Sequence, residues 1–271
     1  MKQRIITAVL VTPFAIAMIL YMPTLGFMSI ISGLCVLAWW EWTRLAGMRS
    51  RPWRAVLVAA GTLALVLLWN CESAPIWWSV IGAGCAWWVV VFLWLRHFSF
   101  AASPTRDHIV LKLCAGALTV LPAWAAMMRL HLSQTAPHTW ALYALVLIWV
   151  ADTFAYLAGS RWGRIKLAPQ ISPGKTLAGV YGALIGSAMI AAIGGWLLDV
   201  RGVTLVLLVL LGLVSVVFSI AGDLFESLIK RHANVKDSGM LFPGHGGACD
   251  RLDGVFAALP IFALGKFLLG L

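Results

Sequence analysis

Residues 203–226 read VTLVLLVLLGLVSVVFSIAGDLFE, and no charged residue interrupts the first twenty of them. About 20 consecutive apolar residues are enough for a helix to span the hydrocarbon core of a bilayer. Comparable hydrophobic stretches recur along the whole chain. The sequence therefore predicts an all-α fold, a polytopic transmembrane helical bundle.

The composition agrees with this fold class. Hydrophobic residues make up 62% of the 271 residues and charged residues only 11%, whereas soluble domains average roughly 45–50% and about 25%. We expect about nine spans in a single integral membrane domain, residues 1–271, and we read the first span as a retained helix rather than a signal peptide. The expected spans are 5–21, 25–45, 54–70, 76–95, 110–130, 139–159, 177–198, 203–226 and 253–270.

The basic residues indicate the orientation of the bundle. With the N-terminus in the cytoplasm, 17 of the 20 Lys and Arg residues fall at the N-terminus or in the loops near 44–54, 96–112, 160–176 and 227–252. The positive-inside rule therefore predicts a cytoplasmic N-terminus. The net charge of +10 also suits attraction to anionic lipid headgroups. Because no soluble basic domain is present, nucleic acid is not an expected partner.

Carboxylates inside spans are expensive, so each one is a candidate functional residue. The helix at 203–226 ends in a polar stripe whose members lie three or four positions apart, on one helix face. Its members are Ser219, Asp223, Glu226, Ser227 and Lys230. The stripe either forms salt bridges that hold the bundle together or binds Mg²⁺, since few cations lie within the membrane. Asp152, in the span 139–159, either packs helices together or lines a polar cavity.

The loop before the span 177–198 reads SPGKT, residues 172–176. A helix N-terminus offers unpaired N–H groups and the positive end of the dipole, so Ser172, Lys175 and Thr176 would complete a phosphate cradle. The segment is not a P-loop, because the GxxxxGK[ST] spacing is absent. An ordinary turn and helix start is the alternative.

The most informative stretch, residues 227–253, reads SLIKRHANVKDSGMLFPGHGGACDRLD. Glycines let a loop approach a phosphate closely, Lys and Arg neutralise its charge, and paired carboxylates hold Mg²⁺ against phosphate oxygens. Together these parts predict a nucleoside triphosphate site between two helices. Taken singly, Asp250 and Asp253 also suit a helix N-terminus, Lys230 also suits a cytoplasmic loop, and His245 is also typical of a loop.

This stretch closely resembles the signature of the phosphatidate cytidylyltransferase (CDP-diacylglycerol synthase) family. The signature runs Ser, two residues, Lys-Arg, four residues, Lys-Asp, then a small residue, Pro, His-Gly-Gly and Asp-Arg. The matching residues are Ser227, Lys230, Arg231, Lys236, Asp237, Gly239, Pro243, His245, Gly246, Gly247, Asp250 and Arg251. Looser resemblance extends to Glu41-Trp42, to 152–159 and to 222–224. Ala178 and Ala248 depart from the pattern, which puts a role for the side chain at 178 in doubt.

The resemblance implies a nucleotidyltransferase of phospholipid biosynthesis, in which the phosphate of phosphatidate attacks the α-phosphorus of CTP and diphosphate leaves. It implies Mg²⁺ at Asp223 and Asp250, and it leaves open a second, monovalent cation and a homodimer. The expected catalytic residues are Asp223, Lys230, His245, Asp250 and Arg251. The expected substrate-binding and phosphate-binding residues are Asp152, Ser172, Lys175, Thr176, Ser227, Arg231, Lys236, Asp237, Gly246 and Gly247.

Within the single domain, we expect the N-terminal helices in residues 1–135, and the catalytic helices and cytoplasmic loops in residues 136–271. We expect the protein in a bacterial inner, or cell, membrane, with the active site facing the cytoplasm. Two alternatives stay open: a cytidylyltransferase that acts on a polyprenyl phosphate, and, from a different class, a membrane transporter.

Overall fold

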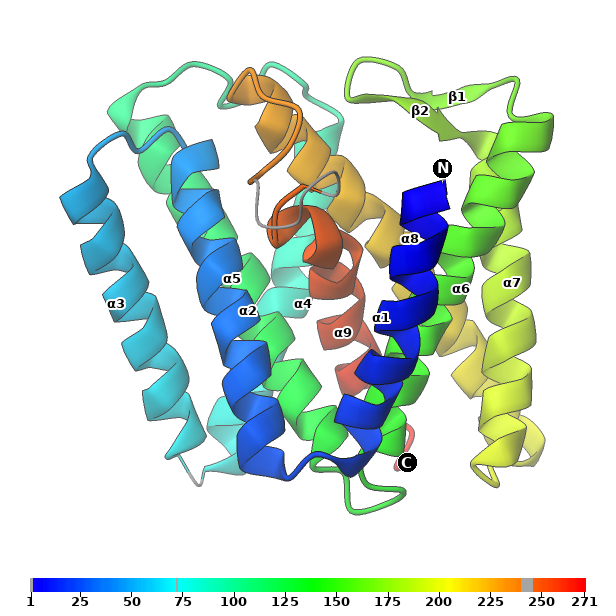
Figure 1. The fold of residues 1–271 in the computed structure, drawn as a ribbon. Coiled ribbons are helices and arrows are strands. Elements are labelled where there is room, and N and C mark those ends of the chain that lie inside the picture. Colours follow the sequence, from blue (N-terminus) through cyan, green and yellow to red (C-terminus); the bar gives the residue numbers. More distant parts are fainter. Residues whose placement is uncertain (1, 72, 240–245) are drawn as a thin grey trace.

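The described part of the chain consists of nine helices and one two-stranded hairpin (Figure 1). The computed structural model describes residues 2–71, 73–239 and 246–271, and for residues 2–11 the backbone alone. The helices are α1 (Lys2–Tyr21), α2 (Thr24–Leu45), α3 (Arg51–Trp69), α4 (Ala74–Leu95), α5 (Arg106–His131), α6 (Thr139–Trp162), α7 (Leu177–Leu197), α8 (Gly202–His232) and α9 (Cys249–Leu268). The strands β1 (Lys166–Ala168) and β2 (Ser172–Thr176) lie between α6 and α7.

The predicted all-α membrane architecture is confirmed. In the described part of the chain, the seven helices α2 to α8 are each long and apolar enough to cross a membrane. Helix α9 is also 20 residues long, but it carries Asp250, Arg251, Asp253 and Lys266. The fold therefore combines apolar spans with a more polar helix, on which Lys266 is buried and Arg251 is exposed.

Helix α9 lies in the middle of the bundle (Figure 1), and it packs against α2, α4, α5, α6 and α8. Its approach to α8 is close because small residues face each other. A Cβ atom on Gly222 would meet the carbonyl oxygen of Asp253 at 2.5 Å. Small residues allow helix backbones to approach in membrane bundles. This packing places the part of α8 that carries Asp223 and Glu226 beside the start of α9, which carries Asp250 and Asp253.

The segment 172–176 is not the loop that the sequence predicted. It forms strand β2, which pairs antiparallel with β1, with Lys166 opposite Thr176 and Ala168 opposite Ser172. The short turn at 169–171 allows this pairing, because it brings the two segments back on each other. Thr176 then ends the hairpin and begins α7, where its side-chain oxygen accepts a hydrogen bond from the Gly179 N–H at 3.2 Å.

The predicted loop after residue 226 is also shorter than expected. Helix α8 continues to His232, and α9 begins at Cys249 rather than at 253. Leu228 and Ile229 are buried, so apolar packing carries the helical repeat beyond the charged positions. Both the hairpin and this end of α8 lie at the upper end of the bundle in Figure 1, whereas the C-terminus lies at the lower end.

Candidate functional site

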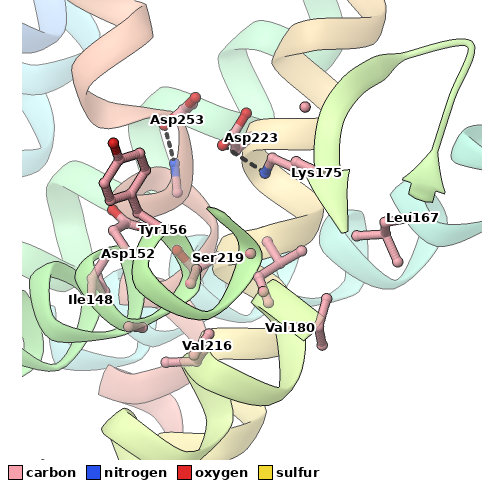
Figure 2. Close-up of a pocket in the computed structure, with 18 of the residues that line it drawn as sticks. Ile148, Asp152, Tyr156, Leu167, Lys175, Val180, Val216, Ser219, Asp223 and Asp253 are labelled. Atoms are coloured by element: carbon pink, nitrogen blue, oxygen red, sulfur yellow. Dashed lines mark hydrogen bonds and ion pairs between the residues drawn. The ribbon is translucent and has the colours of Figure 1, made fainter. Parts of the chain in front are cut away.

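A cavity of about 550 Å³ opens between α6, α7, α8, α9 and the β2 strand. Its polar lining includes four aspartates and two cations. These are Asp152, Asp223, Asp250, Asp253, Lys175 and Arg251. Figure 2 shows that Asp152 comes from α6, Asp223 from α8 and Asp253 from α9, and that Lys175 reaches in from the hairpin. Apolar residues such as Ile148, Val180 and Val216 line another part of the same cavity.

The β1–β2 hairpin places the Lys175 side chain against Asp223 in the cavity lining. The Lys175 ammonium lies 2.6 Å from the Asp223 carboxylate, and the two side chains are 23% and 41% exposed. Arg231 holds the hairpin against α8, because its Nε donates to the Ile171 carbonyl at 3.2 Å. Ser227 donates to Asp223 at 3.4 Å. Lys175 is therefore placed by strand pairing rather than by a helix N-terminus.

A second, more buried ion-pair group joins α8 to α9. The Lys230 Nζ atom lies 3.0 Å from Glu226 Oε2 and 2.6 Å from Asp250 Oδ1. These side chains are nearly enclosed, with exposed fractions of 12% for Lys230, 3% for Glu226 and 9% for Asp250. The predicted polar face of α8 is thus confirmed as a real stripe. Its salt bridges hold α9 as well as neighbouring turns of α8.

The second oxygen of Asp250 is held by the segment between α8 and α9. Asp250 Oδ2 accepts hydrogen bonds from Ser238 N at 2.8 Å, from Ser238 Oγ at 2.9 Å and from Gly247 N at 2.8 Å. Gly246 has a φ of +85°, a left-handed conformation that favours glycine. A side chain there would also crowd the Asp250 carboxylate. The glycine pair therefore allows the segment to close over this aspartate.

The structure brings six of the predicted site residues to the cavity. They are Asp152, Lys175, Thr176, Asp223, Asp250 and Arg251. Lys230 and Ser227 lie behind this lining, through their contacts with Asp250 and Asp223. Ser172 lies on β2 outside the lining, and the exposed Lys236 and Asp237 lie between α8 and α9. His245 falls outside the described residues.

Two residues beside this site, Glu41 on α2 and Ser238, were not among the predicted site residues, although Glu41-Trp42 was part of the looser resemblance. Glu41 is buried, with 9% of its surface exposed, and it accepts a hydrogen bond from Ser238 Oγ at 2.7 Å. A carboxylate inside the predicted span 25–45 was a signal that could have found it. Ser238 gave no such signal, because a lone serine in a polar segment is common.

The donor set is suited to Mg²⁺, although the described residues do not form a complete metal site. Mg²⁺ prefers carboxylate and phosphate oxygens, and Asp223 presents a partly exposed carboxylate to the cavity. Within the described residues, no group of three or more His, Cys, Asp or Glu side chains is arranged to hold a metal ion. A divalent cation would therefore need oxygens from water or a phosphate in addition to the protein's own.

Comparisons with known proteins point to one family over the whole chain. The model of the cytidylyltransferase family matches residues 2–268. A phosphatidate cytidylyltransferase of Pseudomonas aeruginosa is 37% identical over 268 residues, which cover 97% of this chain and 96% of that protein. The Haemophilus influenzae protein of the same name is 31% identical and covers 98% of this chain and 99% of its own length. The Thermotoga maritima protein of that name is 27% identical, with 96% and 94% covered.

Proposed function

The chain belongs to the cytidylyltransferase family, and from that premise we propose that it is a phosphatidate cytidylyltransferase, which converts CTP and phosphatidate to CDP-diacylglycerol and diphosphate. The observation that carries this proposal is the match to relatives of that name over nearly the full length of both chains. Membership of an enzyme family sets the transporter alternative aside.

The proposed reaction is a substitution at phosphorus. A phosphate oxygen of phosphatidate forms a bond to the α-phosphorus of CTP, and the bond from that phosphorus to the oxygen bridging to the β-phosphorus breaks. Diphosphate leaves with the electron pair of that bond. The attacking phosphate is already ionised near neutral pH, so the reaction needs little base catalysis. Catalysis at phosphorus depends mainly on positioning and charge stabilisation.

The cavity supports this chemistry through its two kinds of wall. Its polar part carries Lys175 and Arg251, which are suited to phosphate oxygens. Its apolar part, which includes Val180 and Val216, is suited to the start of an acyl chain. A lipid phosphate needs both kinds of surface. His245 stays a predicted positioning group rather than a base.

The charge balance of the cavity supports a role for Mg²⁺. Four aspartates face two cations in the lining, so its formal charge is −2. A triphosphate would be repelled by such a surface unless cations accompany it. Asp223 and Asp250 would hold Mg²⁺, which would offset the charge of the leaving diphosphate when bound. A monovalent cation and a homodimer stay predictions.

We also propose a cytoplasmic location for the site in a bacterial cell membrane. CTP is a cytoplasmic metabolite, and the loops with most Lys and Arg residues lie at the same end of the predicted bundle as the site. Phosphatidate would keep its acyl chains in the bilayer while its headgroup reaches the helix ends.

The test is an assay of purified protein in detergent micelles with CTP, Mg²⁺ and phosphatidate. CDP-diacylglycerol is the expected product, and its formation should depend on both CTP and Mg²⁺. A polyprenyl phosphate serves as the alternative acceptor. Transfer to that acceptor alone would keep the chemistry and overturn the substrate, whereas no transfer to either acceptor from folded protein would overturn the proposed function.

A further inference from the structure

A buried carboxylate on α2 lies outside the cavity, yet it contacts the segment that holds the site. Glu41 is absent from the cavity lining and is 9% exposed. In the described part of the chain, no salt bridge neutralises it. It accepts instead from Ser238 Oγ at 2.7 Å, from Cys249 N at 3.0 Å and from Ala248 N at 3.1 Å. A buried carboxylate with three donors aimed at it is a specific arrangement, since burying a charge is otherwise unfavourable.

Two of these donors are the first N–H groups of α9. The N-cap residue of this helix is Ala248, which makes no side-chain cap hydrogen bond. Unpaired N–H groups at a helix start need an acceptor, and a negative charge there is favourable. Glu41 provides both the acceptor and the negative charge, although it lies more than 200 positions earlier in the chain. It therefore fixes the start of α9, whose first turn carries Asp250.

The third donor, the Ser238 hydroxyl, lies between Glu41 and Asp250 and links the two carboxylates. Ser238 Oγ lies 2.7 Å from Glu41 Oε2 and 2.9 Å from Asp250 Oδ2. The hydroxyl has one hydrogen, so it donates to one carboxylate at a time. Each carboxylate keeps two backbone N–H donors in either case. The hydroxyl thus couples the two carboxylates without leaving either one unsatisfied.

The neighbouring backbone is shaped around the same carboxylate. A Cβ atom added to Gly239 or to Gly247 would collide with the Glu41 side chain. One turn along α2, Arg44 donates from Nη2 to the Ser238 carbonyl at 2.7 Å. Helix α2 therefore holds Ser238 by two hydrogen bonds, one to the Ser238 carbonyl oxygen and one from the Ser238 hydroxyl.

We propose that Glu41 is a positioning residue for cytidylyl transfer, which sets the place of Asp250 through the Ser238 hydroxyl and the first N–H groups of α9. The inference rests on the proposed function, because it takes Asp250 to act in that reaction. Glu41 itself does not touch the substrate cavity. Its removal should displace a carboxylate at the site while leaving the cavity's other groups in place.

The experiment compares Glu41→Gln, Ser238→Ala and the double variant with a control, Asp107→Asn. Asp107 is an exposed carboxylate in the first turn of α5, so it undergoes the same chemical change away from the site. Misplacement of a catalytic group by about 1 Å can lower the rate about 100-fold. We expect kcat to fall about 10–100-fold in Glu41→Gln, with a change in the KM for CTP below about threefold.

The double variant separates positioning from simple stabilisation. If Glu41 acts through Ser238, the loss of kcat in the double variant should be smaller than the product of the two single losses. If Glu41 only stabilises the fold, the thermal midpoint falls while the kcat of the folded fraction stays at the parent value. That second result, or fully multiplicative losses, would overturn the proposal.

A readout without turnover distinguishes this proposal from the proposed function. Lys236 is exposed two positions before Ser238, so limited trypsin cleavage after Lys236 reports how firmly the segment is held. We expect faster cleavage there in Glu41→Gln than in Asp107→Asn. Faster cleavage in a protein whose parent transfers no cytidylyl group would overturn the proposed function but keep the anchoring by Glu41. Unchanged cleavage together with unchanged kcat would overturn the anchoring.

Discussion

Replacing Lys230 by Met should destabilise the bundle strongly. The Lys230 ammonium lies between the Glu226 and Asp250 carboxylates, at 3.0 and 2.6 Å, and it is only 12% exposed. Its loss would leave two nearly enclosed carboxylates without their cation. Breaking a buried ion pair by removing one partner costs about 3–5 kcal/mol. At about 2–4 °C per kcal/mol for a chain of this size, the thermal midpoint should fall by roughly 6–20 °C.

The assay is thermal unfolding in detergent, followed by tryptophan fluorescence, with a matched control and a rescue. Lys112→Met is the control: Lys112 is also buried, at 3% exposed, but no salt bridge joins it to any part of the chain that the structure describes. Its removal should lower the midpoint by much less. Adding Glu226→Gln to Lys230→Met should recover part of the loss, because one unpaired charge disappears. Equal midpoints for Lys230→Met and Lys112→Met would refute the reasoning.

Four further outcomes follow from the site. Asp250→Asn should abolish turnover while the protein still inserts into the membrane, and normal CDP-diacylglycerol formation by that variant would contradict the metal assignment. Lys175→Met should raise the KM for CTP about tenfold but change stability by less than about 1 kcal/mol, because its pairing with Asp223 is partly exposed; a parental KM would rule out phosphate binding by Lys175. Thr176→Ala should lower the stability measured by thermal unfolding by about 0.5–2 kcal/mol through loss of the α7 cap, and an unchanged midpoint would argue against that cap. Chelation of divalent cations should stop transfer, and added Mg²⁺ should restore it; full activity in the chelator would exclude a divalent cofactor.

The sequence predicted all nine helices, and seven of them, α2 to α8, are long and apolar enough to be spans in the part of the chain that the structure describes, because a bilayer imposes one length and one composition on every helix that crosses it. It predicted the ends of helices less well where the helix is surrounded by other parts of the protein instead of lipid. Helix α8 continues past residue 226 because Leu228 and Ile229 are buried against protein. The β1–β2 hairpin was missed for a related reason. Its strands are only three and five residues long, too short for a period-two pattern to be read.

The contacts of the site were predictable where the two residues lie four positions apart on the same helix. The i, i+4 contacts from Asp223 to Ser227 and from Glu226 to Lys230 follow directly from helix geometry. The contact from Lys175 to Asp223 does not, because it depends on how a hairpin folds over a helix 48 residues later in the chain. Roles for the predicted site residues stay predictions until variants are assayed.

Glu41 explains why the first helices and the catalytic helices cannot be treated as independent halves. The division at residue 135 places Glu41 in one part and Asp250 in the other, yet the Ser238 hydroxyl lies within hydrogen-bond distance of both. Helix α9 also packs against α4, α5, α6 and α8, and the Lys230–Asp250 salt bridge from α8 already contacts its first turn. Glu41 adds a charged acceptor at the N-terminus of α9, which further fixes the orientation of this turn. The N-terminal helices therefore contribute to the geometry of the site through Glu41 and Arg44 of α2, although none of their described side chains lines the cavity.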